Sequence, residues 1–197
     1  MRGFYTALMG SFHLRVATME DVPRIRGLIN ASVRELQTKD YTAAQIEGAL
    51  ATVFTVDSRL VEDGTYFVAI TESGELAGCG GWSFRKTLYG GDHQIERVVP
   101  ERLDPEADAA KIRAIFVHPD FARLGLGGLI LATAESAAIK QGFHRFEMGS
   151  TLTGVALYTL KGYHEVGRIK VPVSEEETIE VVRMVKEIAR HSRVVLR

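Results

Sequence analysis

The sequence is poor in cysteine and holds only Cys79 among its 197 residues. A lone cysteine cannot form a disulfide within the chain, which fits a reducing compartment, so we expect a cytoplasmic protein. The six histidines are scattered, and none has the spacing of a metal-ligating pair. The sequence therefore gives no support for a metal site.

An excess of charge of one sign is also missing, because 24 Lys and Arg face 25 Asp and Glu. Proteins that neutralise nucleic-acid phosphates usually carry a basic stripe, so we expect no nucleic-acid partner. The longest apolar stretch, near residues 124–134, is well short of the ~20 residues that cross a bilayer, and we expect no membrane partner. Residues 1–12 form a short, weakly apolar run that we interpret as a flexible leader rather than a signal peptide.

What remains is a chain of ordinary globular composition, which we interpret as one domain over residues 13–197. Hydrophobic periodicity predicts helices and strands in alternation, with an irregular insertion rich in Gly and Pro at residues 86–109. This interleaving predicts an α/β fold with a mixed sheet and helices on both faces. The expected strands are 13–17, 65–71, 76–84, 111–117, 143–149, 163–172 and 177–188, and the expected helices 22–36 (with Asp21 as N-cap), 42–52, 126–141 and 153–161.

Glycines are concentrated where the strand ending at Val117 leads into a helix. Gly125, Gly127 and Gly128 open that helix, although each Gly in a helix costs about 1 kcal/mol relative to Ala. Bare N–H groups at a helix start can lie directly on a phosphate, and Arg123 beside them would add a charged donor. The alternative is a loop whose glycines merely permit a tight turn.

Two familiar phosphate motifs fit this segment poorly. A P-loop would end in Gly-Lys-Ser/Thr, whereas this segment ends in Gly-Gly-Leu. A dinucleotide fingerprint would need a third Gly at Ile130, and its acidic residue would be Glu147, inside a strand rather than at its end. A nucleotide-binding module stays as an alternative to be tested with ATP or NAD.

The stretch 112–142, with Val117-His118-Pro119-Asp120 before the glycines, resembles the loop and helix of the GNAT superfamily of acetyl-CoA-dependent acyltransferases. The segment 156–163, Ala-Leu-Tyr-Thr-Leu-Lys-Gly-Tyr, resembles the second GNAT motif, a short helix with a Tyr followed by Gly and an aromatic residue. The resemblance covers residues 111–167. It implies a GNAT-like fold, in which a mixed, mostly antiparallel sheet is flanked by helices on both faces. It also implies that the protein is an N-acetyltransferase.

The sequence departs from the family pattern at three places. Ala122 stands where members carry Arg or Gln, with Arg123 one residue later. Residues 151–154 supply hydroxyl groups where many members have an Asn, and the insertion at 86–109 is longer than the usual connection.

The resemblance also implies a site. Acetyl-CoA would be the co-substrate, without a metal, and its pyrophosphate would bind the backbone of the glycine-rich segment. The pantetheine arm would pair with the preceding strand, and a backbone N–H near Val117 would stabilise the oxyanion. The implied cofactor-binding residues are Ile115, Phe116, Val117, Arg123, Leu124, Gly125, Leu126, Gly127, Gly128 and Thr153.

Tyr158 is the implied catalytic acid, because a phenol can protonate the departing thiolate. Without the motif around it, Tyr158 would more often be a core aromatic residue packed on Val155. Ala156, Gly162 and Tyr163 beside it favour the catalytic role. The acceptor would be a small-molecule amine or a protein N-terminus, and the C-terminal strands could pair two subunits into a homodimer. A non-catalytic acyl-CoA-binding domain is the alternative function.

Several residues near the implied site were weighed without a firm role. The general base is left open among groups that include Asp92, His93, Glu96 and Glu147. Trp82 and Phe84 could line an acceptor pocket or belong to the core, and His118 is expected to cap a strand and to carry no chemistry.

Overall fold

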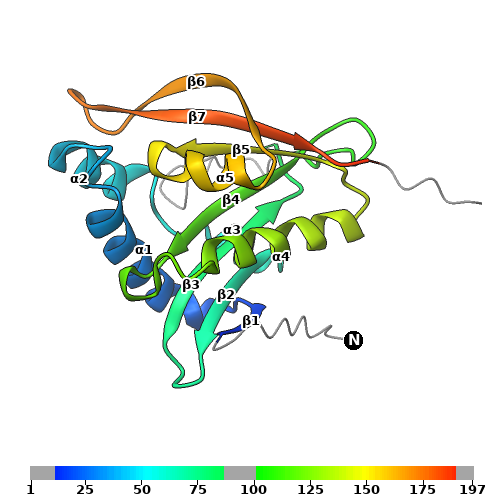
Figure 1. Cartoon of the computed structure of the whole chain (residues 1–197), viewed down its shortest axis with the longest axis horizontal. Coiled ribbons are helices and arrows are strands. Elements are labelled where there is room, and N and C mark those ends of the chain that lie inside the picture. The colour runs from blue at the N-terminus through cyan, green and yellow to red at the C-terminus, as the bar shows by residue number, and fades with distance from the viewer. Residues whose placement is uncertain (1–11, 87–100, 190–197) are drawn as a thin grey trace, which may run out of the picture.

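The computed structural model describes residues 12–86 and 101–189 as a seven-stranded sheet with helices on both faces (Figure 1). The predicted α/β class is confirmed. The strands are β1 (Phe12–Val16), β2 (Tyr66–Thr71), β3 (Leu76–Ser83), β4 (Ala110–Val117), β5 (Arg145–Thr151), β6 (His164–Pro172) and β7 (Thr178–Glu187). The helices are α1 (Val22–Leu36), α2 (Ala43–Thr52), α3 (Ser58–Glu62), α4 (Leu126–Lys140) and α5 (Val155–Leu160).

The strand order is β1-β2-β3-β4-β5-β7-β6, and every neighbouring pair is antiparallel except β4 and β5. All predicted strands and helices form, with ends shifted by at most two residues. Phe12, which we placed in the leader, opens β1; the rest of the leader and residues 87–100 of the insertion lie outside the described residues.

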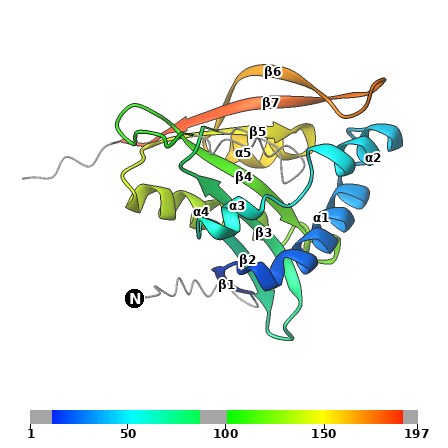
Figure 2. The ribbon, with the colours of Figure 1, turned by 180° about the vertical axis from the view of Figure 1, so that it is seen from behind.

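The two faces of the sheet bury separate groups of apolar side chains. One face packs against α1, α2 and α3, which Figure 2 shows in front of the sheet, and the other packs against α4 and α5. Neighbouring residues of β7 divide between them, since Val181 joins the first core and Val182 the second. This alternation follows from the two-residue period of a strand and explains the nearly continuous apolar sequence of the central strands.

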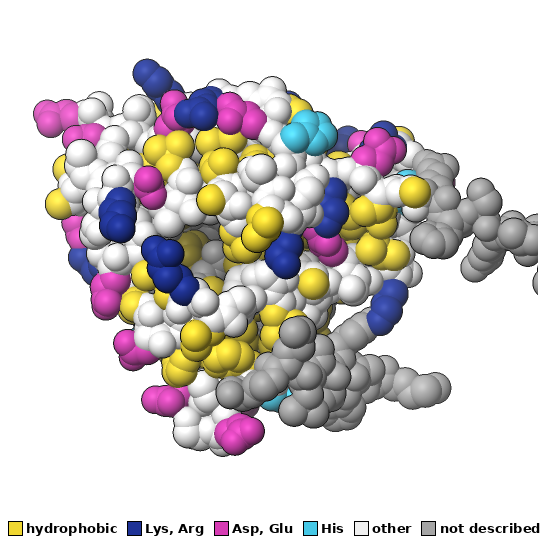
Figure 3. Space-filling view, in the orientation of Figure 1, with side chains coloured by type: hydrophobic (Ala, Val, Ile, Leu, Met, Phe, Trp, Pro, Cys, Tyr) yellow, Lys and Arg dark blue, Asp and Glu magenta, His cyan; other side chains and the backbone are white. Residues whose placement is uncertain are grey.

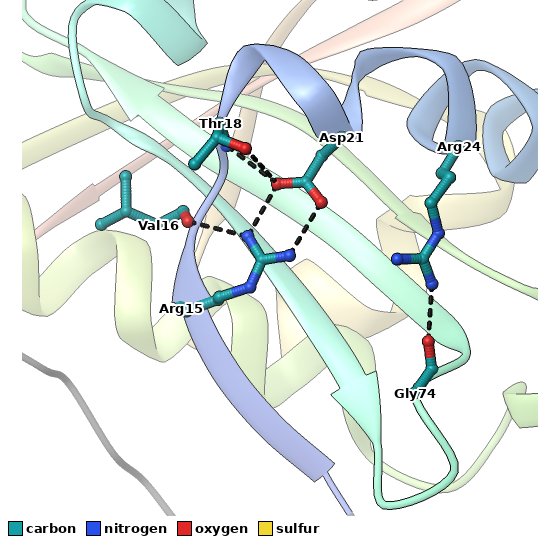
Figure 4. A network of polar contacts seen from close by, with 6 residues as sticks. All are labelled: Arg15, Val16, Thr18, Asp21, Arg24 and Gly74. Atoms are coloured by element: carbon teal, nitrogen blue, oxygen red, sulfur yellow. Dashed lines mark hydrogen bonds and ion pairs between the residues drawn. The ribbon is translucent and has the colours of Figure 1, made fainter.

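The start of α1 is fixed by an ion pair that replaces the expected helix cap (Figure 4). Asp21 occupies the N-cap position, but its carboxylate makes no side-chain cap. Instead it accepts two hydrogen bonds of 2.7 Å from Arg15 of β1 and one of 2.8 Å from the N–H of Thr18. Arg24, further along α1, donates to the carbonyl of Gly74 in the β2–β3 turn at 2.6 Å. These contacts fasten α1 to β1 and to the β2–β3 hairpin.

We predict that Asp21→Asn lowers the free energy of unfolding by about 2 kcal/mol at pH 7. The hydrogen bonds from Arg15 lower the pKa of Asp21 from 3.8 to about 2. The carboxylate therefore contributes its stability above about pH 4, and that contribution is lost as the pH falls through 2. Urea unfolding at pH 7 and pH 2.5 measures the effect, with the exposed Glu20→Gln as control. Equal stability of Asp21→Asn and wild type at pH 7 would contradict the assignment.

Candidate active site

A β-bulge in β4 shapes the centre of the sheet. Between the pairs Cys79↔Phe116 and Gly81↔Arg113, β3 advances by two residues and β4 by three. Ala114 lies in this bulge with a φ of 51°. Its carbonyl accepts a hydrogen bond of 2.8 Å from the hydroxyl of Tyr66.

The glycines of β3 make room for this bulge. A Cβ at Gly80 would lie 2.7 Å from Cγ1 of Ile115, and one at Gly81 would lie 2.2 Å from the carbonyl oxygen of Thr65. Both distances are far below van der Waals contact. These two glycines thus allow a close approach of neighbouring protein backbone and side chains.

Ala114 provides a direct test of the bulge. A positive φ costs a non-glycine residue about 1–2 kcal/mol, so Ala114→Gly should leave stability equal or slightly higher. Ala114→Val should lower the free energy of unfolding by about 1–2 kcal/mol, because β-branching disfavours this conformation further. Urea unfolding of both variants measures the difference, and a stable Ala114→Val would argue against the left-handed backbone.

Beyond the bulge, β4 and β5 separate. Their parallel pairing is confined to Ala110↔Phe146 and Lys111↔Glu147, although both strands run on for several residues (Figure 1). A cleft opens between the diverging strand ends. Its described lining residues are Gln37, Val53, Phe54, Thr55, Ile112, Arg113, Ala114, Ile115, Phe116, Met148, Gly149, Ser150, Thr151, Tyr158, Val171, Ile179 and Val181.

The backbone at the end of β4 offers a donor on the cleft side. The N–H of His118 donates to the carbonyl of Ala77 in β3 at 2.8 Å. Successive N–H groups of a strand point to opposite sides, so the N–H of Val117 points away from β3, toward the separated β5. This is the orientation that the predicted oxyanion contact requires.

The loop before α4 presents a run of free backbone donors. Gly125 has a φ of 82° and is the N-cap of α4, and Arg123 has a φ of 63°. The first bond of the helix joins the N–H of Leu129 to the carbonyl of Gly125 at 3.1 Å. Within the described parts of the chain, the N–H groups from Arg123 to Gly128 have no hydrogen-bond acceptor. Free amides at the positive end of a helix dipole are donors of the kind that can bind an anion.

Two glycines of this helix start also let α5 approach closely. A Cβ at Gly127 would lie 3.2 Å from Leu157 Cδ2, and one at Gly128 would lie 2.9 Å from Cε and 3.3 Å from Nζ of Lys161. Leu157 and Lys161 are four residues apart and share one face of α5. The Lys161 ammonium thus lies beside the free amides, and no described residue accepts a hydrogen bond or an ion pair from it.

We did not predict Lys161 from the sequence. The available signal was its spacing from Leu157 on a helix that follows a glycine-rich loop. Figure 3 shows this face of the molecule hollowed between α5 and the start of α4, with Lys and Arg side chains bordering the hollow.

Tyr158 belongs to α5, and its side chain lines the cleft between β4 and β5. Its ring lies against Gly154, where an added Cβ would be 2.7 Å from the ring Cε2 and, on another side, 2.9 Å from Ser150 Oγ. Tyr163 packs edge-on at 6.1 Å between ring centroids. Burial raises the pKa of Tyr158 to about 12, so the phenol keeps its proton at neutral pH. Tyr158 is therefore both part of the core around α4 and α5 and part of the cleft lining.

Other residues singled out in the sequence make protein contacts. Thr153 donates its hydroxyl to Asp40 Oδ2 at 2.5 Å, so its contact with a coenzyme stays a prediction. Glu147 is buried and bonded to both Lys111 and Arg183, and it is not among the residues that line the cleft.

The remaining candidates lie elsewhere. Trp82 and Phe84 line a second hollow together with Phe143, on the side of the sheet that packs against α4. His118 accepts a hydrogen bond at Nδ1 from the N–H of Asp120 at 3.3 Å, so it caps the 3-10 helix that follows β4 rather than the strand that we expected it to cap. Asp92, His93 and Glu96 lie outside the described residues.

Two searches of the described residues were negative. No group of three or more His, Cys, Asp or Glu side chains in this part of the chain could hold a metal ion. None of the described helices has the length and apolarity that a bilayer crossing requires.

Comparison with known families decides how this arrangement is to be interpreted. The profile of the Acetyltransferase (GNAT) family matches residues 30–163, about two thirds of the sequence. The chain belongs to the GNAT family. The match includes β4, the glycine-rich start of α4 and Tyr158, so the GNAT resemblance of these segments is confirmed and the chain is an acyltransferase.

Solved GNAT structures share the fold over nearly the whole chain. A GCN5-related N-acetyltransferase from Rhodopseudomonas palustris is 19% identical, with a TM-score of 0.66 over 92% of this chain and 99% of that one. PaiA N-acetyltransferase from Thermoplasma acidophilum, solved with coenzyme A, is 13% identical with a TM-score of 0.59, covering 91% and 100%. The acetyltransferase YncA from Salmonella typhimurium, solved with acetyl-CoA, is 18% identical with a TM-score of 0.59, covering 93% and 97%. A search of curated proteins gave no match.

Proposed function

We propose that the protein transfers the acetyl group of acetyl-CoA to the amine of a small molecule or of a protein N-terminus. The observation that carries this proposal is the combination of three features: free amides at the start of α4, an edge of β4 that β5 leaves unpaired, and Tyr158 in the lining of the cleft between these strands. GNAT membership and the coenzyme complexes of similar folds support acetyl-CoA as the donor.

The donor would lie along the opened sheet edge. The N–H groups from Arg123 to Gly128 would bind the pyrophosphate, and the Lys161 ammonium would add a charge-assisted hydrogen bond. The pantetheine arm would pair with Ile115, Phe116 and Val117 as a strand would, because β5 has left this edge of β4. Binding both substrates in one cleft makes the encounter of amine and thioester nearly unimolecular.

Acetyl transfer would proceed by direct attack of the amine. The amine nitrogen bonds to the carbonyl carbon of the thioester, the N–H of Val117 stabilises the oxyanion, and the carbon–sulfur bond breaks. The nitrogen loses one proton to solvent, and the departing thiolate gains one from Tyr158. Cys79 is not suited to carry the acetyl group, because it is fully buried and burial raises the pKa of its thiol to about 12.

The proposal is tested by thiol release from acetyl-CoA in the presence of an amine panel, with a thermal-shift measurement of ligand binding. We expect acetyl-CoA to raise the melting temperature and at least one amine to release free thiol and yield an acetylated product. Coenzyme binding without turnover on any amine would favour the non-catalytic alternative. Protection by ATP or NAD but not by acetyl-CoA would favour a nucleotide-binding module.

A further inference from the structure

The cleft continues through the sheet to the side that packs against α1 and α2. Its lining includes Tyr158 and Met148 from the core around α4 and α5, but also Phe54, Val171 and Ile179 from the core around α1 and α2. The proposed donor occupies the side of α4 and α5. The opposite end, walled by the end of α1 and the loop after α2, is therefore the place for the acceptor.

Two polar side chains at this end have a buried oxygen atom without a hydrogen-bond partner among the described residues. Gln37 follows α1 and is only 5% exposed, and its Oε1 has neither water access nor a hydrogen-bond partner within the described residues. Thr55, in the loop between α2 and α3, has an equally isolated Oγ1. Buried polar atoms are normally paired, so unpaired ones that line a cleft point to a ligand. Only two other buried side-chain atoms in the described chain are unpaired, and both lie outside this cleft: Trp82 Nε1 and His144 Nε2.

Backbone contacts hold Gln37 in place while its carboxamide stays free. Its N–H donates to the carbonyl of Val33, and its own carbonyl accepts from the N–H groups of Asp40 and Tyr41, each at 3.1 Å. An apolar side chain at this position would keep all three backbone hydrogen bonds and would leave no buried polar atom unpaired. A glutamine at this position is therefore better explained by what it binds than by what it supports.

The chemistry of these groups defines the ligand that they can recognise. A carboxamide both donates and accepts, and its oxygen and nitrogen can exchange places by rotation. A threonine hydroxyl likewise does both. The charged groups nearby satisfy each other, because Arg113 donates to Asp57 Oδ2 at 2.8 Å. The free groups are thus neutral and complement a neutral amide, while Phe54, Val171 and Ile179 would cover an apolar substituent.

Building on the proposed function, we infer that the acceptor is an α-amino amide with an apolar side chain, whose amide group is bound by Gln37 and Thr55. An α-amino group has a reference pKa near 8, against about 10.4 for an alkylamine such as lysine, so far more of it is neutral and nucleophilic at physiological pH. Free amino-acid amides and peptide N-termini share this chemistry.

Three acceptors that share the same apolar side chain test the inference: leucinamide, leucine and 3-methylbutylamine. The dipeptide Leu-Ala is added to distinguish a peptide N-terminus from a free amino-acid amide. We expect kcat/KM for leucinamide or the dipeptide to exceed that for leucine and 3-methylbutylamine by at least tenfold. Gln37→Leu should lower kcat/KM for the preferred amide about tenfold and that for 3-methylbutylamine less than threefold. Thr55→Val should act in the same direction by a smaller factor.

A structural role for Gln37 predicts a different result. If Gln37 supported the fold, Gln37→Leu would lower the melting temperature and all activities together. Binding by Gln37 predicts an equal or higher melting temperature in the free protein, since an unpaired buried group is removed, with unchanged protection by acetyl-CoA.

The outcomes separate this inference from the proposed function. Thiol release with alkylamines but no preference for amides, or a preference that survives in Gln37→Leu and Thr55→Val, would overturn the inference and leave the acetyltransferase intact. Should Gln37→Leu fail to fold, Gln37→Met and Thr55→Val give the same readout. An absence of thiol release with every amine would instead overturn the proposed function.

Discussion

Replacing Tyr158 with phenylalanine is expected to lower kcat about 100-fold while the Kd for acetyl-CoA changes less than about twofold. The variant removes only the hydroxyl, which we assign as the proton donor to the departing thiolate, and general acid catalysis contributes 10²–10⁴-fold to a rate. The ring remains and keeps its packing on Gly154 and Tyr163. The initial rate of thiol release at saturating substrate measures kcat, and calorimetric titration measures the Kd for acetyl-CoA.

Tyr163→Phe is the matched control. Its hydroxyl is also buried, but it donates to Glu135 at 2.8 Å and does not line the cleft. That variant should lose some stability and keep kcat within a few-fold of wild type. Normal turnover in Tyr158→Phe, or an equal loss in both variants, would remove Tyr158 from the mechanism.

The pH dependence of kcat gives a second readout for Tyr158. Burial raises its pKa to about 12, above the reference value of 10, so the hydroxyl stays protonated in the folded protein as the pH rises past 10. The kcat of the wild type should rise as the ammonium group of the acceptor loses its proton, and it should then stay constant up to pH 10. A decline centred near pH 9 would point to a different acid.

Local sequence patterns were sufficient to predict most of the elements. Helix α1 repeats apolar residues at helical spacing from Val22 to Leu36, and the burial of that face confirms the prediction. Helix α2 forms within the predicted range 42–52, and the structure adds that Thr42 is its N-cap and accepts from the N–H of Gln45. Helix α3 was missed, since Ser58–Glu62 is too short to show a period and forms through packing.

The cleft was not predictable in the same way. The bulge depends on a positive φ at Ala114, and alanine carries no signal for that conformation. Gln37 and Thr55 follow helices near the N-terminus, whereas Val181 comes from β7, which reaches the cleft because it lies between β5 and β6. The glycines at the start of α4 stand out in the sequence as candidate phosphate-binding positions. The room that they leave for Leu157 and Lys161 depends on where α5 packs, which the sequence does not indicate.

Lys161→Glu is expected to raise the Kd for acetyl-CoA about 100-fold, and Lys161→Ala about tenfold. A hydrogen bond to a charged group contributes about 1.5–3 kcal/mol, and a glutamate would in addition repel the pyrophosphate. Both effects should shrink as salt rises from 0.05 to about 0.5 M, because Lys161 is exposed and screened. The exposed Lys170→Glu in β6 is the control and should leave Kd unchanged. Equal affinities of Lys161→Glu and wild type at low salt would exclude this contact.

Gly128→Ala separates the lysine from the amides. Its new Cβ would lie 2.9 Å from Lys161 Cε, so the flexible lysine must move, while the backbone N–H groups can keep their places. The variant should therefore weaken acetyl-CoA binding about as much as Lys161→Ala. In the double variant the second change should add little, because the two substitutions remove the same interaction. Fully additive losses would mean that Gly128 acts through its own amide instead, with Lys161 contributing separately.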